Sequence, residues 1–431
     1  GCVVQALRAS IMHCLADPGE PSDLSAYEFF DDGLLVIDAG HVVAAGAATK
    51  LLSDLPADMP VLDYSGKLIV PGFIDCHVHF PQLDIIGSYG AQLLDWLNQY
   101  AYPAEAKFSD PDHAREVASV FVDELLANGT TTALVFGTVH AHSVDAIFEA
   151  ADARGMRLIA GKVLMDSNCP EDLQDDAETG YSDSKALIER WHRKGRLGYA
   201  ITPRFALTSS SEQLAAAGRL ASEYPDVWIH THLAENMDEV EEIARLFPDS
   251  RSYLDVYERH NLLRDRSVFA HCLHMDEEDR ASMAANGGAA AFCPTSNLFL
   301  GSGLFDLGAM REAGVRCGLG TDVGGGTSLS LLKTASEAYK VLHLQDQALP
   351  AMRALYLATL GAAEALYLDD KIGNFEAGKE ADFVVLDFEG SRLTARRTAA
   401  ATTMEEKLFA LITLADDRNV AATYVNGEVV R

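Results

Sequence analysis

The chain of 431 residues lacks the features of membrane and secreted proteins. No apolar run approaches the roughly 18 residues that cross a bilayer. The longest example, GLLVIDAGHVVAAGAA, is interrupted by Asp38 and His41. No basic stretch followed by an apolar block stands near the N-terminus, so we expect no secretory signal and a cytoplasmic location. A membrane is not an expected partner.

Paired cysteines and a basic surface are also missing. The seven cysteines contain no C-x-x-C pair, which indicates reduced thiols in a cytosolic protein. Lys and Arg number 34 against 64 Asp and Glu, which gives a net charge of −30. Such a surface repels phosphate backbones, so nucleic acid is not an expected partner. A small neutral or cationic ligand fits this charge better.

A repeated pattern of β-rich run, polar turn and helix fills the middle of the chain. Two of its helical segments are Asp110–Gly129 and Ser209–Tyr224. In the first, apolar residues recur at helical spacing and a Gly closes the segment. Eight such units over about 300 residues predict an α/β fold, a (β/α)8 barrel of the TIM type. A doubly wound sheet is the alternative, but no G-x-G-x-x-G follows a first strand. The eight runs are KLIVPGFIDCHVHF, TTALVFGTV, RLIAGKVLM, LGYAITPRFAL, VWIHTHLAE, SVFAHCLH, AAAFCPTSN and RCGLGTDVGGG.

Both ends of the chain differ from the middle. Residues 1–68 and 369–431 contain short β runs around Gly turns, including Asn-Gly and Glu-Gly. We therefore predict one small β-sandwich domain built from both termini. Residues 69–368 would form the catalytic barrel.

Histidines and acids stand where several of the runs end, which is where a barrel of this kind places its active site. His77 and His79 are two residues apart on one strand, so their side chains point the same way. The fifth run adds a histidine, and the eighth ends at Asp322. Three or four nitrogen and oxygen ligands with one open position are typical of a catalytic metal centre.

The fifth run, VWIHTHLAEN, offers two histidines. His232 is nearer the strand end, so we predict that it binds the metal and that His230 is barrel packing. Glu235 lies in the loop beyond and is placed to move protons rather than to bind metal. We interpret His140 and His142, and His274 of the sixth run, as packing too.

Taken in order, the motifs PGFIDCHVH, HTHLAEN, AHC and GLGTDVGGG resemble the amidohydrolase superfamily, in its mononuclear deaminase branch. HFPQ, LLDWLNQYAYPAEAKF, TPRFALTSS, CPTSNLFLGSG and IGNFEAGKEADF resemble the purine deaminases of that branch in order and spacing. The resemblance covers the chain from about residue 60 to its end. The aromatic segment DWLNQYAYP is interpreted as a lid or a barrel cap.

The resemblance implies roles for individual residues. Its metal ligands match His77, His79, His232 and Asp322, and its purine-binding residues match Gln82, Arg204, Phe205 and Glu235. Glu235 also matches the proton shuttle, and His271 matches a histidine beside the metal, so the catalytic residues would be Glu235, Asp322 and His271. Zinc, one ion per chain, is the implied metal, and the sequence does not distinguish it from iron. A homodimer is implied as well.

One departure from the binuclear amidohydrolases is visible in the sequence. Those enzymes carry a carbamylated Lys on the fourth barrel strand, and the run YAITPRF has none. Lys162 lies one run earlier. We therefore predict one metal ion rather than two. FCPTSN also lacks the second Cys of the P-C-x-x-C found in cytidine-type zinc deaminases.

The implied reaction removes the 2-amino group of guanine and gives xanthine and ammonia. Asp322 would accept a proton from water, and Glu235 would donate one to ring N3. Phe205 could stack on the ring and Arg204 could donate to a purine oxygen. The alternatives are a related aminohydrolase acting on another aminopurine, a pterin or a triazine, and a metal-free structural relative. The latter should have lost metal ligands, and all four are present.

Overall fold

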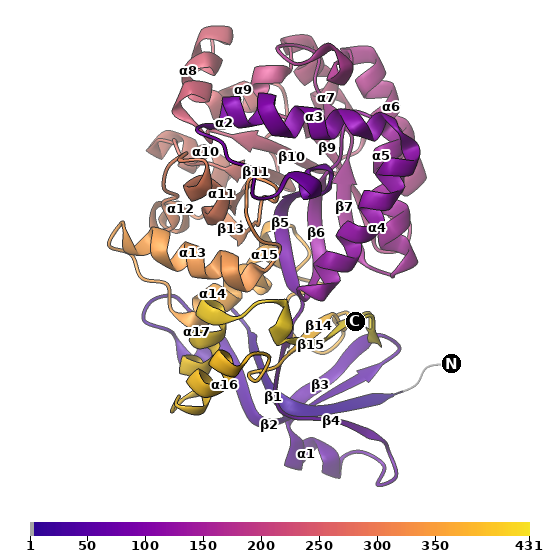
Figure 1. The fold of residues 1–431 in the computed structure, drawn as a ribbon, viewed down its shortest axis with the longest axis vertical. Coiled ribbons are helices and arrows are strands. Elements are labelled where there is room, and N and C mark those ends of the chain that lie inside the picture. Colours follow the sequence, from indigo (N-terminus) through magenta and orange to yellow (C-terminus); the bar gives the residue numbers. More distant parts are fainter. Residues whose placement is uncertain (1–3) are drawn as a thin grey trace. The chain divides into compact units, whose positions relative to one another are not determined.

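The computed structural model describes residues 4–431 and contains two β-sheets (Figure 1). A sheet of nine strands comes from the middle of the sequence, and a sheet of seven strands comes from its two ends. The predicted α/β class and the predicted pairing of both termini in one β domain are confirmed.

Eight parallel strands form the barrel in the order of the sequence. Each coincides with one of the eight predicted runs, so the (β/α)8 prediction is confirmed. They are buried nearly throughout, as in Thr130–Phe136, where every residue is buried, because a parallel sheet is covered on both faces. A short ninth strand, β8 (Val163–Leu164), pairs with β9. The barrel strands are β5 (Phe73–His79), β6 (Thr130–Phe136), β7 (Arg157–Gly161), β9 (Leu197–Pro203), β10 (Trp228–Leu233), β11 (Ser267–His271), β12 (Ala289–Phe292) and β13 (Arg316–Leu319).

The first and last barrel strands meet just past the end of β13. The amide of Asp322 donates to the carbonyl oxygen of His77 at 2.8 Å, and the amide of His79 donates to that of Val323 at 2.9 Å. The buried carboxylate of Asp75 reinforces this seam, since it accepts from the amide and hydroxyl of Thr321 at 3.0 and 2.6 Å. Two metal-ligand candidates, His77 and Asp322, are thereby held side by side.

Helices follow the strands, as the pattern predicted. The segments expected at Asp110–Gly129 and Ser209–Tyr224 are α4 (Pro111–Ala127) and α7 (Ser211–Glu223). Among residues 4–431, no helix is both long and apolar enough to cross a membrane. The remaining helices are α1 (Ala48–Ser53), α2 (Leu93–Trp96), α3 (Tyr102–Ala106), α5 (Ala141–Ala153), α6 (Ala177–Trp191), α8 (Met237–Leu246), α9 (Tyr253–Arg259), α10 (Glu277–Ala285), α11 (Pro294–Phe299), α12 (Leu307–Ala313), α13 (Leu331–His343), α14 (Ala351–Ala358), α15 (Leu360–Ala365), α16 (Arg392–Ala399) and α17 (Met404–Leu414).

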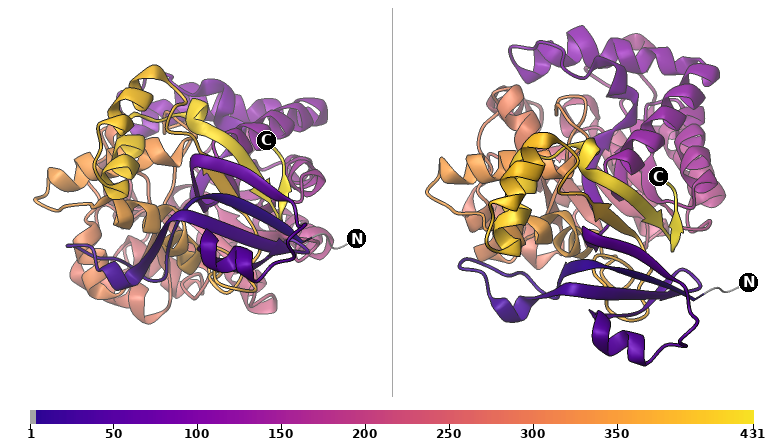
Figure 2. Two further views of the ribbon diagram at one scale, coloured as in Figure 1. Left: turned by 90° about the horizontal axis from the view of Figure 1, so that it is seen from below. Right: turned by 60° about the horizontal axis from the view of Figure 1, so that its bottom comes forward.

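The terminal sheet is one continuous path of seven strands, ordered β16-β15-β14-β4-β1-β2-β3. Strands from the N-terminal end, in indigo, lie beside strands from the C-terminal end, in yellow (Figure 2). They join where β14 pairs antiparallel with β4, with Val384 opposite Val70. The strands are β1 (Gln5–Cys14), β2 (Tyr27–Asp38), β3 (His41–Ala47), β4 (Val61–Pro71), β14 (Phe383–Leu386), β15 (Val420–Val425) and β16 (Glu428–Val429).

The chain divides into two compact units. One holds the terminal sheet and runs up to Ile74, with Glu124–Thr132 and Ser330–Arg431, and the other holds Asp75–Asp123 and Ala133–Leu329. This division groups helices α13 to α15 with the terminal sheet, whereas the boundaries drawn from the sequence, 68/69 and 368/369, group them with the barrel. Those boundaries stay a prediction.

Candidate active site

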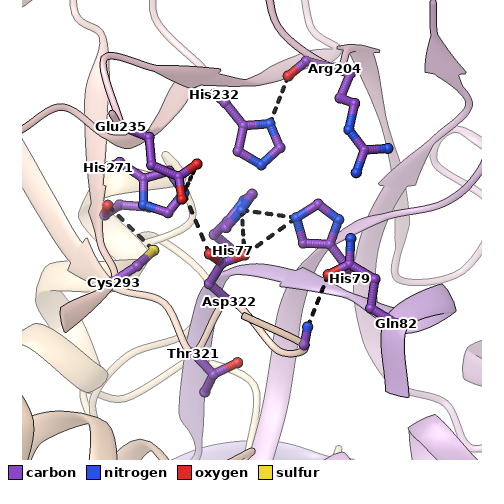
Figure 3. A network of polar contacts seen from close by, with 12 residues as sticks. His77, His79, Gln82, Arg204, His232, Glu235, His271, Cys293, Thr321 and Asp322 are labelled. Carbon is purple, nitrogen blue, oxygen red and sulfur yellow. Dashed lines mark hydrogen bonds and ion pairs between the residues drawn. The ribbon is translucent and has the colours of Figure 1, made fainter. Parts of the chain in front are cut away.

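Four side chains, from two barrel strands and the loop that follows a third, converge at one end of the barrel (Figure 3). His77 and His79 come from β5, His232 from β10, and Asp322 follows β13. One ligand atom from each of the four lies within 4.8 Å of the others, and all four residues are buried. This is the set that the resemblance implied as metal ligands.

Asp322 lies against both histidines of β5. Its Oδ1 is 3.0 Å from Nε2 of His77 and 3.3 Å from Nε2 of His79. Burial alone would raise the pKa of this carboxyl, but His77 and His79 hold it well below its usual range. Asp322 is therefore a carboxylate at neutral pH.

The imidazoles of His79 and His232 are neutral. Burial lowers the pKa of His79 to about 4 and that of His232 well below its ordinary value. Neutral imidazole is the form that binds metals. Nδ1 of His232 lies 2.7 Å from the carbonyl oxygen of Arg204, so Nδ1 carries the hydrogen and Nε2 is left free. Three imidazole nitrogens and one carboxylate oxygen suit a divalent ion such as zinc.

His230 contacts His77 on the side of the ring that faces away from the other candidate ligands. Its Nε2 lies 2.7 Å from Nδ1 of His77. Because Nε2 of His77 faces the cluster, Nδ1–H of His77 is the donor and His230 the acceptor. The sequence suggested packing alone for His230, and the structure adds a polar contact that fixes the ring of His77. The signal was present in the i, i+2 spacing, which puts His230 and His232 on one face of β10.

His271, at the end of β11, lies beside both acids of the site. Its Nε2 is 3.2 Å from Oε1 of Glu235 and 3.5 Å from Oδ2 of Asp322. Nδ2 of Asn297 donates to Nδ1 of His271 at 2.8 Å, so the hydrogen of the neutral ring is on Nε2. Burial lowers the pKa of His271 to about 3.

Glu235 is an acid that holds its proton. Burial, with the nearby charges of Asp322 and Glu239, raises its pKa well above the ordinary value. Its backbone is fixed by the capping box of α8, in which Oε1 of Glu239 accepts from the amides of Glu235 and Asn236 at 3.2 Å each. Tyr253 donates to Oε2 of Glu239 at 2.5 Å. A protonated carboxyl beside the four candidate metal ligands can deliver a proton to a bound molecule.

A cavity opens on the cluster. The predicted substrate-binding residues Gln82, Arg204, Phe205 and Glu235 all line it together with His79, His232 and Asp322. Its apolar wall consists of Leu93, Trp96, Leu97 and Leu300. Two of these, Trp96 and Leu97, come from the segment DWLNQYAYP interpreted as a lid or barrel cap, which includes the end of α2 and the π-helical turn Leu97–Ala101.

Glu105 was not singled out in the sequence, yet it contacts two of the substrate-binding candidates. Its oxygens accept from NH1 and NH2 of Arg204 at 2.6 and 2.9 Å. Nε2 of Gln82 donates to Oε2 at 3.3 Å. Glu105 belongs to α3, away from the strand ends, where a barrel of this kind places its active-site residues. The only signal was its place in the family-like segment YPAEAKF.

The other residues weighed in the sequence make contacts of their own. His140 is bonded to Thr138, His142 to the carbonyl oxygen of Phe108, and His274 to that of Ser302. Lys162 forms a buried ion pair with Asp175. It does not belong to the cluster of His77, His79, His232 and Asp322, and the number of metal ions per chain stays a prediction.

Comparison with known proteins identifies the family. The model of the amidohydrolase family matches residues 68–430, so the chain belongs to the amidohydrolase family, whose members are metal-dependent hydrolases. Guanine deaminase of Escherichia coli (strain K12) is 51% identical over 99% of this chain and 98% of its own length. The solved structure of that E. coli enzyme matches with a TM-score of 0.97 and covers 99% of both chains. Guanine deaminase of C. acetobutylicum, solved with guanine in its active site, is 28% identical over 100% of both chains, with a TM-score of 0.91.

Proposed function

We propose that this chain is a zinc-dependent hydrolase that converts guanine to xanthine and ammonia. The observation that carries the proposal is that one cavity is lined both by candidate metal ligands and by side chains that can hydrogen-bond a purine. His79, His232 and Asp322 line one side of it, and the hydrogen-bond donors of Gln82 and Arg204 line another. The full-length identity to guanine deaminases supports the choice of substrate.

The metal would be held by His77, His79, His232 and Asp322, one ion per chain. A divalent ion there makes a water molecule acidic enough to supply hydroxide near neutral pH. Zinc is proposed because histidine nitrogens and a carboxylate oxygen are its usual protein ligands.

Glu235 and Asp322 would carry the protons. Asp322 is ionised and can accept the proton that water gives up. Glu235 is protonated and can donate to ring N3 of the purine, which makes C2 electrophilic. The oxygen of the water would add to C2 of the purine. Of the two protons of the water, one would replace the proton that Glu235 gives to N3, and the other would pass through Asp322 to the exocyclic amine, whose bond to C2 breaks as ammonia leaves. His271, within 3.2 Å of Glu235, is placed to keep that carboxyl in position.

Arg204, Gln82 and Phe205 would select the base. A guanidinium has only donors, so Arg204 suits the carbonyl oxygen at C6 of guanine. Phe205 contributes an aromatic ring to the same cavity, where it can pack on the purine. An aminopurine without the carbonyl, a pterin or a triazine is the second candidate substrate class. The solved triazine hydrolases that match are under 25% identical, which indicates a shared fold only.

We also propose that the protein is a cytoplasmic homodimer. The support is the family resemblance for the dimer, and for the location the absence of an apolar span and of paired cysteines.

Ammonia release from a panel of guanine, adenine, 2-aminopurine, a pterin and a triazine tests the proposal, with xanthine measured as the product from guanine. We expect guanine to give the highest kcat/KM. No ammonia from guanine with the metal-loaded protein would overturn the proposed function.

A further inference from the structure

A buried carboxylate outside the cavity joins the two polar residues that would recognise the purine. Glu105 makes a bidentate ion pair with Arg204, and the two side chains are 1% and 2% exposed. Its Oε2 also accepts from Gln82, so one side chain contacts both residues. Glu105 itself is absent from the cavity lining.

These contacts settle which atoms Gln82 turns to the cavity. Its Oε1 accepts from the amide of Gly324 at 3.0 Å, and its Nε2 donates to Glu105. A backbone N–H requires an acceptor and a carboxylate requires a donor, so the side-chain amide has one satisfied orientation. The second hydrogen of Nε2 is what remains for a ligand.

Arg204 is placed in the same way. The ion pair uses two of its five N–H groups, and the guanidinium lies 5.0 Å from the centre of the Tyr102 ring. Glu105, on α3, neutralises the positive charge of Arg204. Arg204 therefore presents N–H donors to the cavity without an unpaired positive charge. Both residues therefore offer donors only.

The geometry points to Glu105 as a positioning residue that sets the specificity of this site, and this inference rests on the proposed function. By fixing Arg204 and Gln82 as donors, Glu105 makes the cavity select a purine edge that carries an acceptor, the oxygen at C6. A base without that oxygen leaves buried donors unpaired, and such sites discriminate strongly against it.

Glu105→Gln tests this directly. The substitution keeps the shape of the side chain but replaces one acceptor oxygen with an amide NH2, a donor, where Arg204 and Gln82 need an acceptor. We compare kcat/KM for guanine with kcat/KM for 2-aminopurine, which has the same 2-amino group and no oxygen at C6. The ratio of the two should fall by at least ~10²-fold, since only guanine uses the donors that Glu105 aligns.

Two further variants separate positioning from folding. Glu105→Asp keeps the negative charge that buried Arg204 needs but shortens its reach, so the ratio should fall here too, by a smaller factor. Asp175→Asn breaks another buried ion pair of the barrel, with Lys162, which does not line the cavity. It should lower the melting temperature and leave the ratio unchanged.

The outcomes are distinct. Equal losses on both bases in Glu105→Gln and Glu105→Asp would overturn the positioning role, even with wild-type activity on guanine intact. If Glu105→Gln does not fold, the ratio in Glu105→Asp decides. A wild-type protein that releases no ammonia from guanine would contradict the proposed function instead.

Discussion

The Nδ1 atom of His232 and the backbone carbonyl oxygen of Arg204 are joined by a hydrogen bond of 2.7 Å. A candidate metal ligand on β10 is thus tied to the residue that would bind the substrate, which directly follows the neighbouring strand β9. The bond fixes the tautomer of His232, so its Nε2 is available to a metal. It also couples the position of the metal ligand His232 to that of the substrate-binding residue Arg204.

Metal content is the first prediction. Four ligands in one cluster and a lysine engaged elsewhere lead us to expect about one tightly bound divalent ion per chain. Chelation should abolish ammonia release, and added zinc should restore it. Elemental analysis that finds two ions per chain, or none after expression in metal-replete medium, would contradict this.

Glu235→Gln should lower kcat at least ~10²-fold, because an amide keeps the shape of the side chain and cannot shuttle protons. The metal content should stay the same, since Glu235 is not one of the four ligands. Steady-state rates and elemental analysis on the same preparation check both points. Loss of metal, or a rate close to wild type, would show that the role is wrong.

Arg204 should make the protein prefer guanine to adenine by up to ~10⁴-fold in kcat/KM, because adenine presents an amine where the arginine needs an acceptor. Arg204→Ala should lose activity on guanine and keep its metal. The variant also leaves Glu105 as an unpaired buried charge, which costs about 3–5 kcal/mol of stability. Its rates are therefore measured well below its melting temperature, and comparable wild-type rates on the two bases would refute the assignment.

His230→Ala should weaken metal binding by ~10–100-fold, the usual effect of removing a group that orients a ligand. The reason is the 2.7 Å contact with Nδ1 of His77. Competition with a chelator of known affinity measures the change. His274→Ala is the matched control, because His274 is bonded to the carbonyl oxygen of Ser302 and is not in the cluster. Equal affinities in the two variants would return His230 to a packing role.

Glu239 should make stability depend on pH. Burial raises its pKa from 4.5 to about 7, so the folded state holds this proton more tightly than the unfolded chain. The stabilisation is complete below pH 4.5 and is lost as the pH rises through about 7. Glu239→Gln removes the group that titrates. Any stability advantage of the wild type over this variant should therefore shrink or reverse as the pH rises across that window. Urea unfolding at several pH values measures it, and a constant difference would be evidence against the shift.

The barrel and the group of four candidate metal ligands were predictable because both depend on local sequence patterns. Eight apolar runs ending in polar residues give the strands, and parallel strands bring those ends together. His77 and His79 follow from the two-residue period of one strand. Asp322 follows from its place at the end of the last run.

Glu105 and Asn297 were not predictable in this way. Each is a polar residue in a helical segment, α3 or α11, and nothing local marks it as a partner of Arg204 or of His271. Their roles depend on distances that only the folded barrel sets. His230 lies between these cases, since its face of the strand was foreseeable and its contact with His77 was not.

The bridge from Asp75 to Thr321 has a consequence for how the protein is made. These residues are 246 positions apart in the chain, so β5 leaves the ribosome long before its partner exists. A pairing of such high contact order closes a large loop and forms late and slowly. Until β13 arrives, His77 and His79 have no carboxylate beside them, and a nascent chain that stops short of Thr321 would be a barrel with an open seam. Metal loading should accordingly be a late event that reports completion of the chain, rather than a nucleus around which the barrel folds.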